Sequence, residues 1–484
     1  MPKTNEGNIT NRREITDDDN SRDEISPEQV ERLKSIIEDK EAQILSLQKA
    51  LTKSQEFIVN VHQSIPLKLF RNYDASIGKI MPLRLNKKIK LSKGRLAIKN
   101  SQQVIETLQT KKTNKIDIIC FPMINWNYRY QRPQHILSGL ARKGHRIFYL
   151  TTTLQNLPNH YSIEKLDENI YEISLSCSSY FDIYKDKIDE LALQSLVNSF
   201  KQLQKDVNIN ALSLVMFPSW LPLVLELQKL FGYKILFDCV DNVSGFPNIN
   251  KERIKEEEIL IKSSDLVVVS SDTLFVKIKE HAKKIICIPN AGDFEHFSKT
   301  TSEHLLEDFP KPIVGYFGAI AEWFDADLIE FVAKKRNDVT FVFIGDTYGS
   351  NLKKLMNLDN VYFLGERPYS EIPKYLLEFD VCLIPFKMIK LIQDAHPIKI
   401  YEYFAAGKPV VATDIPALHK MKDLCYIAKS SNDFLEKLDL ALNEKNPDLV
   451  NQRIEFSSKN TWQDRVNLLY VELEKVISLY LGKK

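Results

Sequence analysis

The chain has 484 residues, and its 44% of apolar residues is enough for the cores of about three domains. Its 66 lysines and arginines nearly balance 64 aspartates and glutamates, so the net charge of +2 does not indicate a nucleic acid partner. The six cysteines lie apart, without C-x-x-C pairs or histidines at zinc spacing, which is typical of reduced core residues in a cytoplasmic protein. The sequence shows no signal peptide and no apolar run long enough to span a membrane.

The first part of the amino-terminal region is predicted to be a disordered tail followed by a coiled coil. Residues 1–25 are polar and charged, a composition that favours disorder. In residues 26–66, apolar residues recur at every seventh position from Val30 to Ile65, with a second set three residues later. β-Branched residues at the first position with leucine at the second favour a parallel two-stranded coil, so we expect a homodimer. The alternative is one amphipathic helix that packs on the body of the protein.

Residues 67–115 are predicted to form a basic amphipathic linker. Eight lysines and arginines lie between Lys79 and Lys99 with no acid among them, and apolar residues are interleaved. Such a segment can lie on an anionic membrane surface, where each cation contributes about 1 kcal/mol. We therefore expect a cytoplasmic protein with a peripheral contact to the inner face of the cell membrane. The alternative is a solvated linker.

Beyond residue 115, short apolar strands alternate with helical spans, as expected for parallel sheets covered on both faces. A first set of predicted strands covers residues 116–122, 145–151, 211–218, 233–240, 265–271 and 284–290. A second set covers residues 312–318, 339–345, 361–365, 380–386 and 409–413. We predict an α/β fold with two Rossmann-like domains, 116–297 and 298–460, that face a cleft and follow the coiled-coil region. Residues 461–484 are predicted to form a closing helix.

Candidate binding residues in the first domain follow its predicted strands. The loop after the first strand carries Trp126, Arg129 and Arg132. An aromatic ring with two arginines at a strand's carboxyl end can stack on a sugar and hold an anion. For Arg132 the alternative is an ion pair with a carboxylate of its own fold. Asp238 and Asp241 come with the fourth strand, and Asp241 is the better candidate for the cleft.

Residues 394–413 are the most informative stretch of the second domain. Asp394, Lys399 and Glu402 surround a predicted helix start at Pro397, whose free N–H groups and positive dipole end would face an anionic ligand. Lys399 adds a point charge, and Glu402 can accept hydrogen bonds from a ribose diol. The alternative is that Lys399 and Glu402 form only an i,i+3 surface ion pair, worth roughly 0.2–0.5 kcal/mol.

Together these motifs resemble the retaining glycosyltransferases with two Rossmann-like domains, the GT-B type, and family 4 in particular. The run W-x-x-R-x-Q-R-P-Q-H after the first strand is similar to a bacterial subgroup of that family. The spacing of Asp394 and Glu402 resembles the family's paired glutamates, with aspartate in the first place. Gly315 and Gly318 resemble its first glycine loop, although the arginine that usually follows this loop is missing here.

The resemblance implies a role for each candidate residue. The expected catalytic residues are Asp394, Lys399 and Asp241, and the expected donor-binding residues are Gly315, Gly318, Arg367, Pro397 and Glu402. Trp126, Arg129 and Arg132 are expected to contact the acceptor or an anion. Neither a metal nor another cofactor is implied, because Lys399, the helix start and the glycine loop would stabilise the diphosphate.

The expected activity is retaining transfer of a hexose-type sugar from a nucleoside-diphosphate-sugar donor to a glycan or lipid-linked acceptor in cell-surface polysaccharide synthesis. Two alternatives remain. A GT-B sugar-nucleotide epimerase would share the cleft but would need no acceptor surface. A non-catalytic scaffold of a polysaccharide assembly complex would combine the coil and the basic segment with a degenerate transferase domain. Turnover of nucleotide-sugar with and without an acceptor separates these three functions.

Overall fold

The computed structural model describes residues 101–110, 113–157, 159–246, 249–300, 302–347 and 351–481. All of them belong to one compact unit. The predicted tail, the predicted coiled coil and most of the predicted basic linker lie outside the described residues. Residues 101–110, which the sequence assigned to the linker, form a helix whose Leu108 is buried in a core, so this part belongs to the folded body.

The first sheet has eight strands in the order β10-β9-β8-β7-β1-β2-β5-β4. The strands are β1 (Asp117–Phe121), β2 (Ile147–Leu150), β4 (Tyr161–Asp167), β5 (Ile170–Leu175), β7 (Ala211–Val215), β8 (Lys234–Cys239), β9 (Leu266–Val269) and β10 (Ile285–Cys287). All neighbours are parallel except β4 and β5, which form an antiparallel hairpin at the edge. A separate pair, β3 (Thr153–Leu154) and β6 (Phe181–Asp182), is antiparallel.

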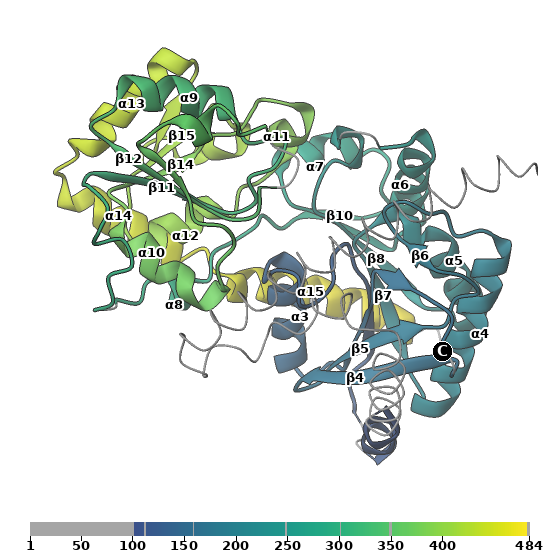
Figure 1. Ribbon diagram of the computed structural model, residues 1–484. Coiled ribbons are helices and arrows are strands. Elements are labelled where there is room, and N and C mark those ends of the chain that lie inside the picture. The colour runs from purple at the N-terminus through teal and green to yellow at the C-terminus, as the bar shows by residue number, and fades with distance from the viewer. Residues whose placement is uncertain are drawn as a thin grey trace, which may run out of the picture. The chain divides into compact units, whose positions relative to one another are not determined.

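Helices cover both faces of this sheet, which is why its central strands are almost wholly apolar (Figure 1). One core includes α4 (Glu190–Val207), α5 (Leu221–Phe231), α6 (Lys251–Ser263) and α7 (Asp272–Ile278). The opposite core includes α3 (Arg132–Arg142) and the last helix, α15 (Trp462–Leu481). A Cβ atom on Gly139 of α3 would lie 2.4 Å from Val466 of α15, so glycine permits the close packing of these two helices.

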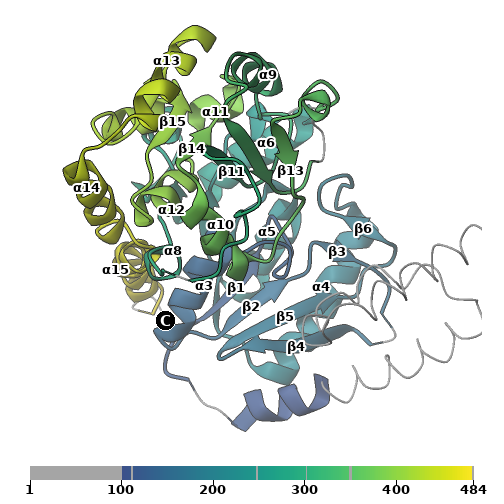
Figure 2. The same cartoon turned by 60° about the vertical axis from the view of Figure 1, so that its left-hand side comes forward.

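The second sheet has six parallel strands in the order β13-β12-β11-β14-β15-β16. The strands are β11 (Ile313–Phe317), β12 (Thr340–Ile344), β13 (Val361–Phe363), β14 (Val381–Ile384), β15 (Val410–Thr413) and β16 (Tyr426–Ala428). The helices of this half are α8 (Phe294–Phe297), α9 (Ala326–Lys335), α10 (Ile372–Glu378), α11 (Lys390–Asp394), α12 (Lys399–Ala405), α13 (Ser431–Leu442) and α14 (Pro447–Ser458). Helices α12 and α14 lie side by side, as do α9 and α13 (Figure 2).

The predicted α/β fold with two parallel sheets is confirmed, and every predicted strand is present. The sequence interpretation missed the β4–β5 hairpin, because exposed residues such as Glu164 and Lys165 interrupt the apolar pattern of this edge strand. Among the described residues, no helix has both the length and the apolar character of a membrane span. In the same part of the chain, no cluster of three or more His, Cys, Asp or Glu side chains is arranged to hold a metal ion.

Candidate functional site

Glycines follow three neighbouring strands of the second sheet at its carboxyl edge. Gly318, Gly345 and Gly365 come after β11, β12 and β13, and their φ angles are +139°, +148° and +70°. A Cβ atom on Gly345 would lie 1.8 Å from the carbonyl oxygen of Gly318, so the first two loops cross in direct backbone contact. Only glycine fits such a crossing, and its two N–H groups are used within the protein, since Gly318 donates to the Ile344 carbonyl and Gly345 to the Gly365 carbonyl, each at 2.9 Å. The crossing lies at the edge where α/β folds bind phosphates.

Gly315, which the sequence assigned to the first glycine loop together with Gly318, does not lie in that loop. It lies inside β11, and a Cβ atom there would be 2.2 Å from the ring of Phe379. Packing of the Phe379 ring against the strand therefore explains this glycine, and the expected donor-binding role of Gly315 is corrected to a structural one. The ligand-facing part of the loop begins at Gly318.

Lys399 and Glu402 lie together on α12, next to the glycine loops. The Lys399 ammonium is 2.9 Å from a Glu402 carboxylate oxygen, as the ion-pair alternative predicted. It is not a surface pair, however, because the Glu402 side chain is only 6% exposed. Lys399 Cε lies 3.0 Å from where a Cβ atom of Gly318 would be, and its ammonium is 4.9 Å from the centre of the Phe317 ring. The pair therefore places a partly exposed cation at the first glycine loop.

The predicted helix start at Pro397 is shifted. Helix α12 begins at Lys399 with Ile398 as its N-cap, and it contains only seven residues. Pro397 is buried in the loop between α11 and α12, outside the first helical turn. The first closing hydrogen bond runs from Tyr401 N–H to the Ile398 carbonyl, so regular helix geometry begins after the proline. Pro397 thus shapes the loop, and its expected direct role at a helix terminus is corrected.

Asp394 occupies a junction between the two halves of the described unit. Its side chain is 2% exposed and accepts hydrogen bonds from the Lys277 ammonium at 2.5 and 2.6 Å and from the Asn242 amide at 2.5 Å. Its carbonyl oxygen accepts a hydrogen bond from the Ser271 hydroxyl. Since first-half side chains occupy both carboxylate oxygens, Asp394 forms a buried bridge between α11 and α7, and its expected contact with a sugar ring remains a prediction.

Arg132 is held in a buried ion pair, which favours the alternative over the expected anion site. Its guanidinium donates to both oxygens of Asp238, at 2.8 to 3.2 Å, and to the Ile288 carbonyl at 2.9 Å. Both side chains are at most 3% exposed. Asp238 therefore lies within β8 as the partner of Arg132, and the expected ligand role of Arg132 is corrected to a structural one.

Arg129 reaches from the loop after β1 to the second sheet. Its Nε donates to Glu366 at 2.8 Å, and a second guanidinium nitrogen is 4.0 Å from Asp346. Asp346 and Glu366 directly follow the glycines after β12 and β13, so Arg129 lies beside the candidate donor edge. Trp126, in the same loop, packs edge to face on Tyr149 with ring centres 5.2 Å apart, which makes it a support of the loop.

Asp241 follows β8 and is half-buried. Among the described residues, its carboxylate has no hydrogen bond or ion pair. Removal from water raises the pKa of Asp241 to about 6; the Arg132 charge opposes this shift and the Asp238 charge adds to it. Such a carboxyl group is available to a ligand, and its charge changes in a range useful for proton transfer.

The raised pKa of Asp241 predicts a change in the pH dependence of stability. The native state binds more protons at this site than the unfolded chain between pH values of about 4 and 6, so this group makes the protein less stable as pH rises through that range. Asp241→Asn should remove this contribution. Urea unfolding at a series of pH values should give wild-type and variant curves that diverge between pH 4 and 6. Parallel curves would show that the Asp241 pKa is ordinary.

Arg367 lies after β13, and its Nε donates to the Tyr375 hydroxyl at 3.1 Å. No carboxylate pairs with it among the described residues, so its expected role near the nucleotide base remains a prediction.

The sequence interpretation missed the neighbouring Tyr369, whose ring stacks on His296 with ring centres 4.3 Å apart and lies with its centre 5.6 Å from that of Tyr130. It also missed Gly345, although three predicted strands of the second sheet each end in a glycine, which was a visible signal.

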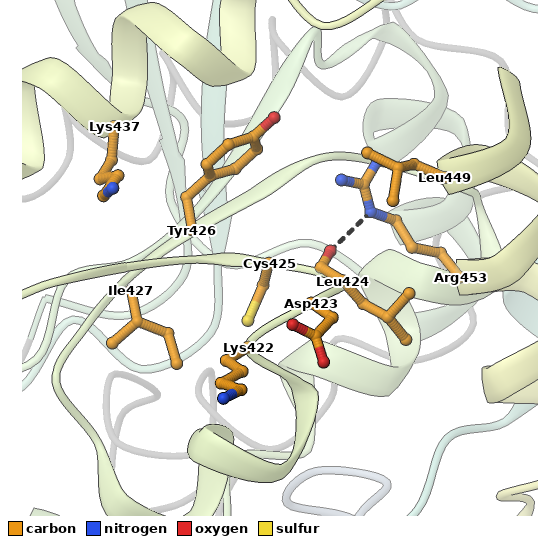
Figure 3. Close-up of a pocket in the computed structure, with 9 residues that line it drawn as sticks. All are labelled: Lys422, Asp423, Leu424, Cys425, Tyr426, Ile427, Lys437, Leu449 and Arg453. Atoms are coloured by element: carbon orange, nitrogen blue, oxygen red, sulfur yellow. Dashed lines mark hydrogen bonds between the residues drawn. The ribbon is translucent and has the colours of Figure 1, made fainter. Parts of the chain in front are cut away.

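A cavity of about 260 Å³ lies elsewhere, at the edge strand β16 (Figure 3). A buried charged group at this cavity, the Arg453 guanidinium, donates to the Leu424 carbonyl at 2.8 Å and pairs with both oxygens of Glu444. Lys422 and Lys437 also line the cavity (Figure 3). Because its buried charge is already satisfied, this cavity is a weaker candidate than the glycine-lined edge.

Comparisons with known proteins relate the chain to glycosyltransferases. Residues 311–444 match the family model described as glycosyl transferases group 1. A 216-residue part of the chain is 28% identical to TuaH of Bacillus subtilis (strain 168), which is described as a teichuronic acid biosynthesis glycosyltransferase. This match covers 40% of the chain and 54% of TuaH, so the chain spans about half the length of that relative.

Solved structures share the fold at low sequence identity. Sucrose-phosphate synthase from Thermosynechococcus elongatus superposes with a TM-score of 0.61 at 14% identity, over 75% of this chain and 100% of that one. Anabaena HepE in complex with UDP and glucose gives a TM-score of 0.56 at 14% identity, with the same coverage. The described unit therefore has a GT-B-like fold, and residues 311–444 within it are similar to the glycosyl transferases of group 1.

Proposed function

We propose that the protein is a retaining glycosyltransferase that moves a hexose-type sugar from a nucleoside diphosphate to a glycan or lipid-linked acceptor. One observation carries the proposal: the crossed backbone of Gly318 and Gly345 meets two cations, Lys399 and Arg129, at the carboxyl edge of the second sheet. Two positive charges beside loops whose glycines carry no side chain fit a diphosphate. The UDP and glucose bound to HepE, which has a similar fold, support this ligand class.

Arg129 supplies the charge that the glycine loop lacks. Its guanidinium is 4.0 Å from Asp346, the residue after Gly345, whose backbone crosses that of Gly318. Arg129 thus approaches the loop from the first half of the unit and Lys399 from the second, so a diphosphate between them would be held from both sides.

The proposed chemistry assigns one task to each group. Lys399 and Arg129 stabilise the negative charge that grows on the leaving diphosphate. Glu402 orients Lys399 and offers its second oxygen to the ribose hydroxyls. Asp241 lies on the first-sheet side, where its carboxylate would accept a hydrogen bond from the reacting sugar or acceptor. The match to TuaH supports a role in cell-surface polysaccharide synthesis.

Glu402→Ala should weaken binding of the donor by roughly 1.5–3 kcal/mol, the range for hydrogen bonds to charged groups. The variant also frees Lys399, which Glu402 orients at 2.9 Å. Glu402→Gln should have a smaller effect, because it keeps one acceptor oxygen. Calorimetric titration with UDP and with UDP-glucose gives the test. Unchanged affinity in a folded Glu402→Ala variant would place the nucleotide elsewhere.

We also propose that the predicted coil in residues 26–66 makes the protein a dimer that binds anionic membranes through the basic segment. A protein that begins at residue 101 should be monomeric and should still bind UDP, because both cores lie beyond that point. Light scattering and co-sedimentation with phosphatidylserine vesicles at low and high salt test both parts. A monomeric full-length chain that ignores these vesicles at low salt would disprove the coil and the membrane contact together.

A further inference from the structure

A second pocket lies in the first half of the unit, at the carboxyl edge of its sheet. It has a volume of about 380 Å³ and lies between the ends of β1, β2 and β5. Its floor is formed by Glu172 and Ser174 of β5 and by Thr151, which follows β2. The Thr151 and Ser174 hydroxyl oxygens are 2.9 Å apart, and Glu172 lies opposite Tyr149 in the strand register. The volume is within the range of small-molecule sites.

The wall of this pocket is the loop after β1, and internal contacts hold it in place. The Asn125 side-chain oxygen accepts hydrogen bonds from the Thr152 N–H at 2.9 Å and from its hydroxyl at 2.8 Å. The Tyr149 hydroxyl donates to the Ile124 carbonyl at 2.5 Å, and the Trp126 ring packs on Tyr149. The loop is therefore fixed in its present shape, so the pocket requires little rearrangement to receive a ligand.

The charges of the pocket select among ligands. Glu172 is half-buried, and among the described residues its carboxylate has neither a hydrogen bond nor an ion pair. Burial raises the pKa of Glu172, and the charge of nearby Glu164 adds to that shift. No lysine or arginine is among the described residues that line the pocket. Hydroxyl donors would satisfy this carboxylate, whereas a carboxylate or phosphate on the ligand would be repelled.

Two further features fit a carbohydrate. Asn127 and Gln155 offer amides that no described residue occupies, and amides can both donate to and accept from hydroxyl groups. Tyr180 is 66% exposed and also lines the pocket, where its ring could stack on the apolar face of a sugar. Asn127 is two residues from Arg129, so one loop joins this pocket to the proposed donor site.

We propose that this pocket binds an uncharged sugar unit of the acceptor, with Glu172 accepting hydrogen bonds from its hydroxyl groups and excluding acidic units. The inference rests on the proposed transferase function and adds the class of acceptor. Thr151 and Ser174 complete the floor, and Asn127 forms the side nearest the donor.

Saturation-transfer NMR on the full-length protein with UDP present tests the proposal. The probes are maltotriose as a neutral saccharide and glucuronic acid as an acidic one. The wild-type protein should bind maltotriose and not glucuronic acid. Glu172→Gln should weaken maltotriose binding by about tenfold, as expected for loss of a charged hydrogen-bond acceptor, and should admit glucuronic acid. Thr151→Val should weaken maltotriose binding without admitting glucuronic acid.

Glu164→Gln is the matched control, because Glu164 lies opposite Glu172 in the β4–β5 register but does not line the pocket. Like the wild type, this variant should bind maltotriose and should not bind glucuronic acid. A wild-type preference for glucuronic acid, or equal effects of the two glutamine variants, would overturn the proposal. Binding of UDP without binding of maltotriose would also overturn it and would leave the donor site intact. Failure to bind UDP or UDP-sugars would instead contradict the proposed function itself.

Discussion

Lys399→Met should lower turnover of the nucleotide-sugar by about 10²- to 10³-fold, the range seen when one preorganised group that stabilises transition-state charge is removed. Donor affinity should fall less, because negative charge on the leaving diphosphate grows as the bond to the sugar breaks. The structure supports this effect, since the Lys399 side chain is 23% exposed beside Gly318 while Glu402 fixes its direction. Steady-state kinetics that separate kcat from KM give the measurement.

The control for Lys399→Met is Lys422→Met, which removes one exposed lysine from the cavity in Figure 3. It should leave kcat and KM unchanged. Because Lys399→Met leaves Glu402 buried without its partner, a thermal melt should show that the variant is folded before kinetics are compared. A loss of affinity equal for UDP and UDP-sugar, with turnover per bound donor unchanged, would contradict the role of Lys399 at the leaving group.

Arg132→Ala should destabilise the protein by about 3–5 kcal/mol, because it leaves the Asp238 carboxylate buried without a counter-charge. The guanidinium is 2% exposed and also donates to the Ile288 carbonyl, so several hydrogen bonds are lost together. The double variant Arg132→Met with Asp238→Leu should recover much of this loss, since it buries no unpaired charge. Urea unfolding monitored by circular dichroism measures the difference.

Arg129→Ala serves as the contrast to Arg132→Ala. Its partner Glu366 is 53% exposed, so this ion pair should contribute no more than about 1 kcal/mol to stability. If Arg132→Ala were as stable as the wild type and instead lost affinity for the donor or acceptor, the ligand role expected from the sequence would return and the structural role would be wrong.

The strands that the sequence predicted are those with continuous apolar runs, since burial on both faces leaves few polar positions in a parallel sheet. The β4–β5 hairpin lies at the sheet edge, where one face and one side meet water, and its exposed Glu164 and Lys165 hid it. Asn169, in the short turn between β4 and β5, was a local signal that was not used, because asparagine tolerates the left-handed conformation that it adopts here with φ of +59°.

The candidate site was less predictable than the fold, because local patterns do not show which side chains pair across the chain. Lys399 and Glu402 are three residues apart, so their contact could be anticipated. Two other pairs join residues that are more than a hundred positions apart in the sequence: Arg132 with Asp238, and Lys277 with Asp394. Their pairing depends on the packed arrangement of both halves. The hydrogen bond from Arg129 to Glu366 also joins distant parts of the chain, so the proposal that Arg129 replaces the missing arginine needed the fold.

The most direct test of the central claim is an NMR assay of the full-length protein with a panel of UDP- and GDP-sugars and a neutral oligosaccharide acceptor. The assay follows release of the nucleoside diphosphate and the anomeric configuration of the product. The proposed function predicts that at least one donor is consumed with retention of configuration, and that Lys399→Met abolishes most of this turnover. A folded protein that neither binds nor consumes any of these donors, or that converts one to an epimer without an acceptor, would contradict it.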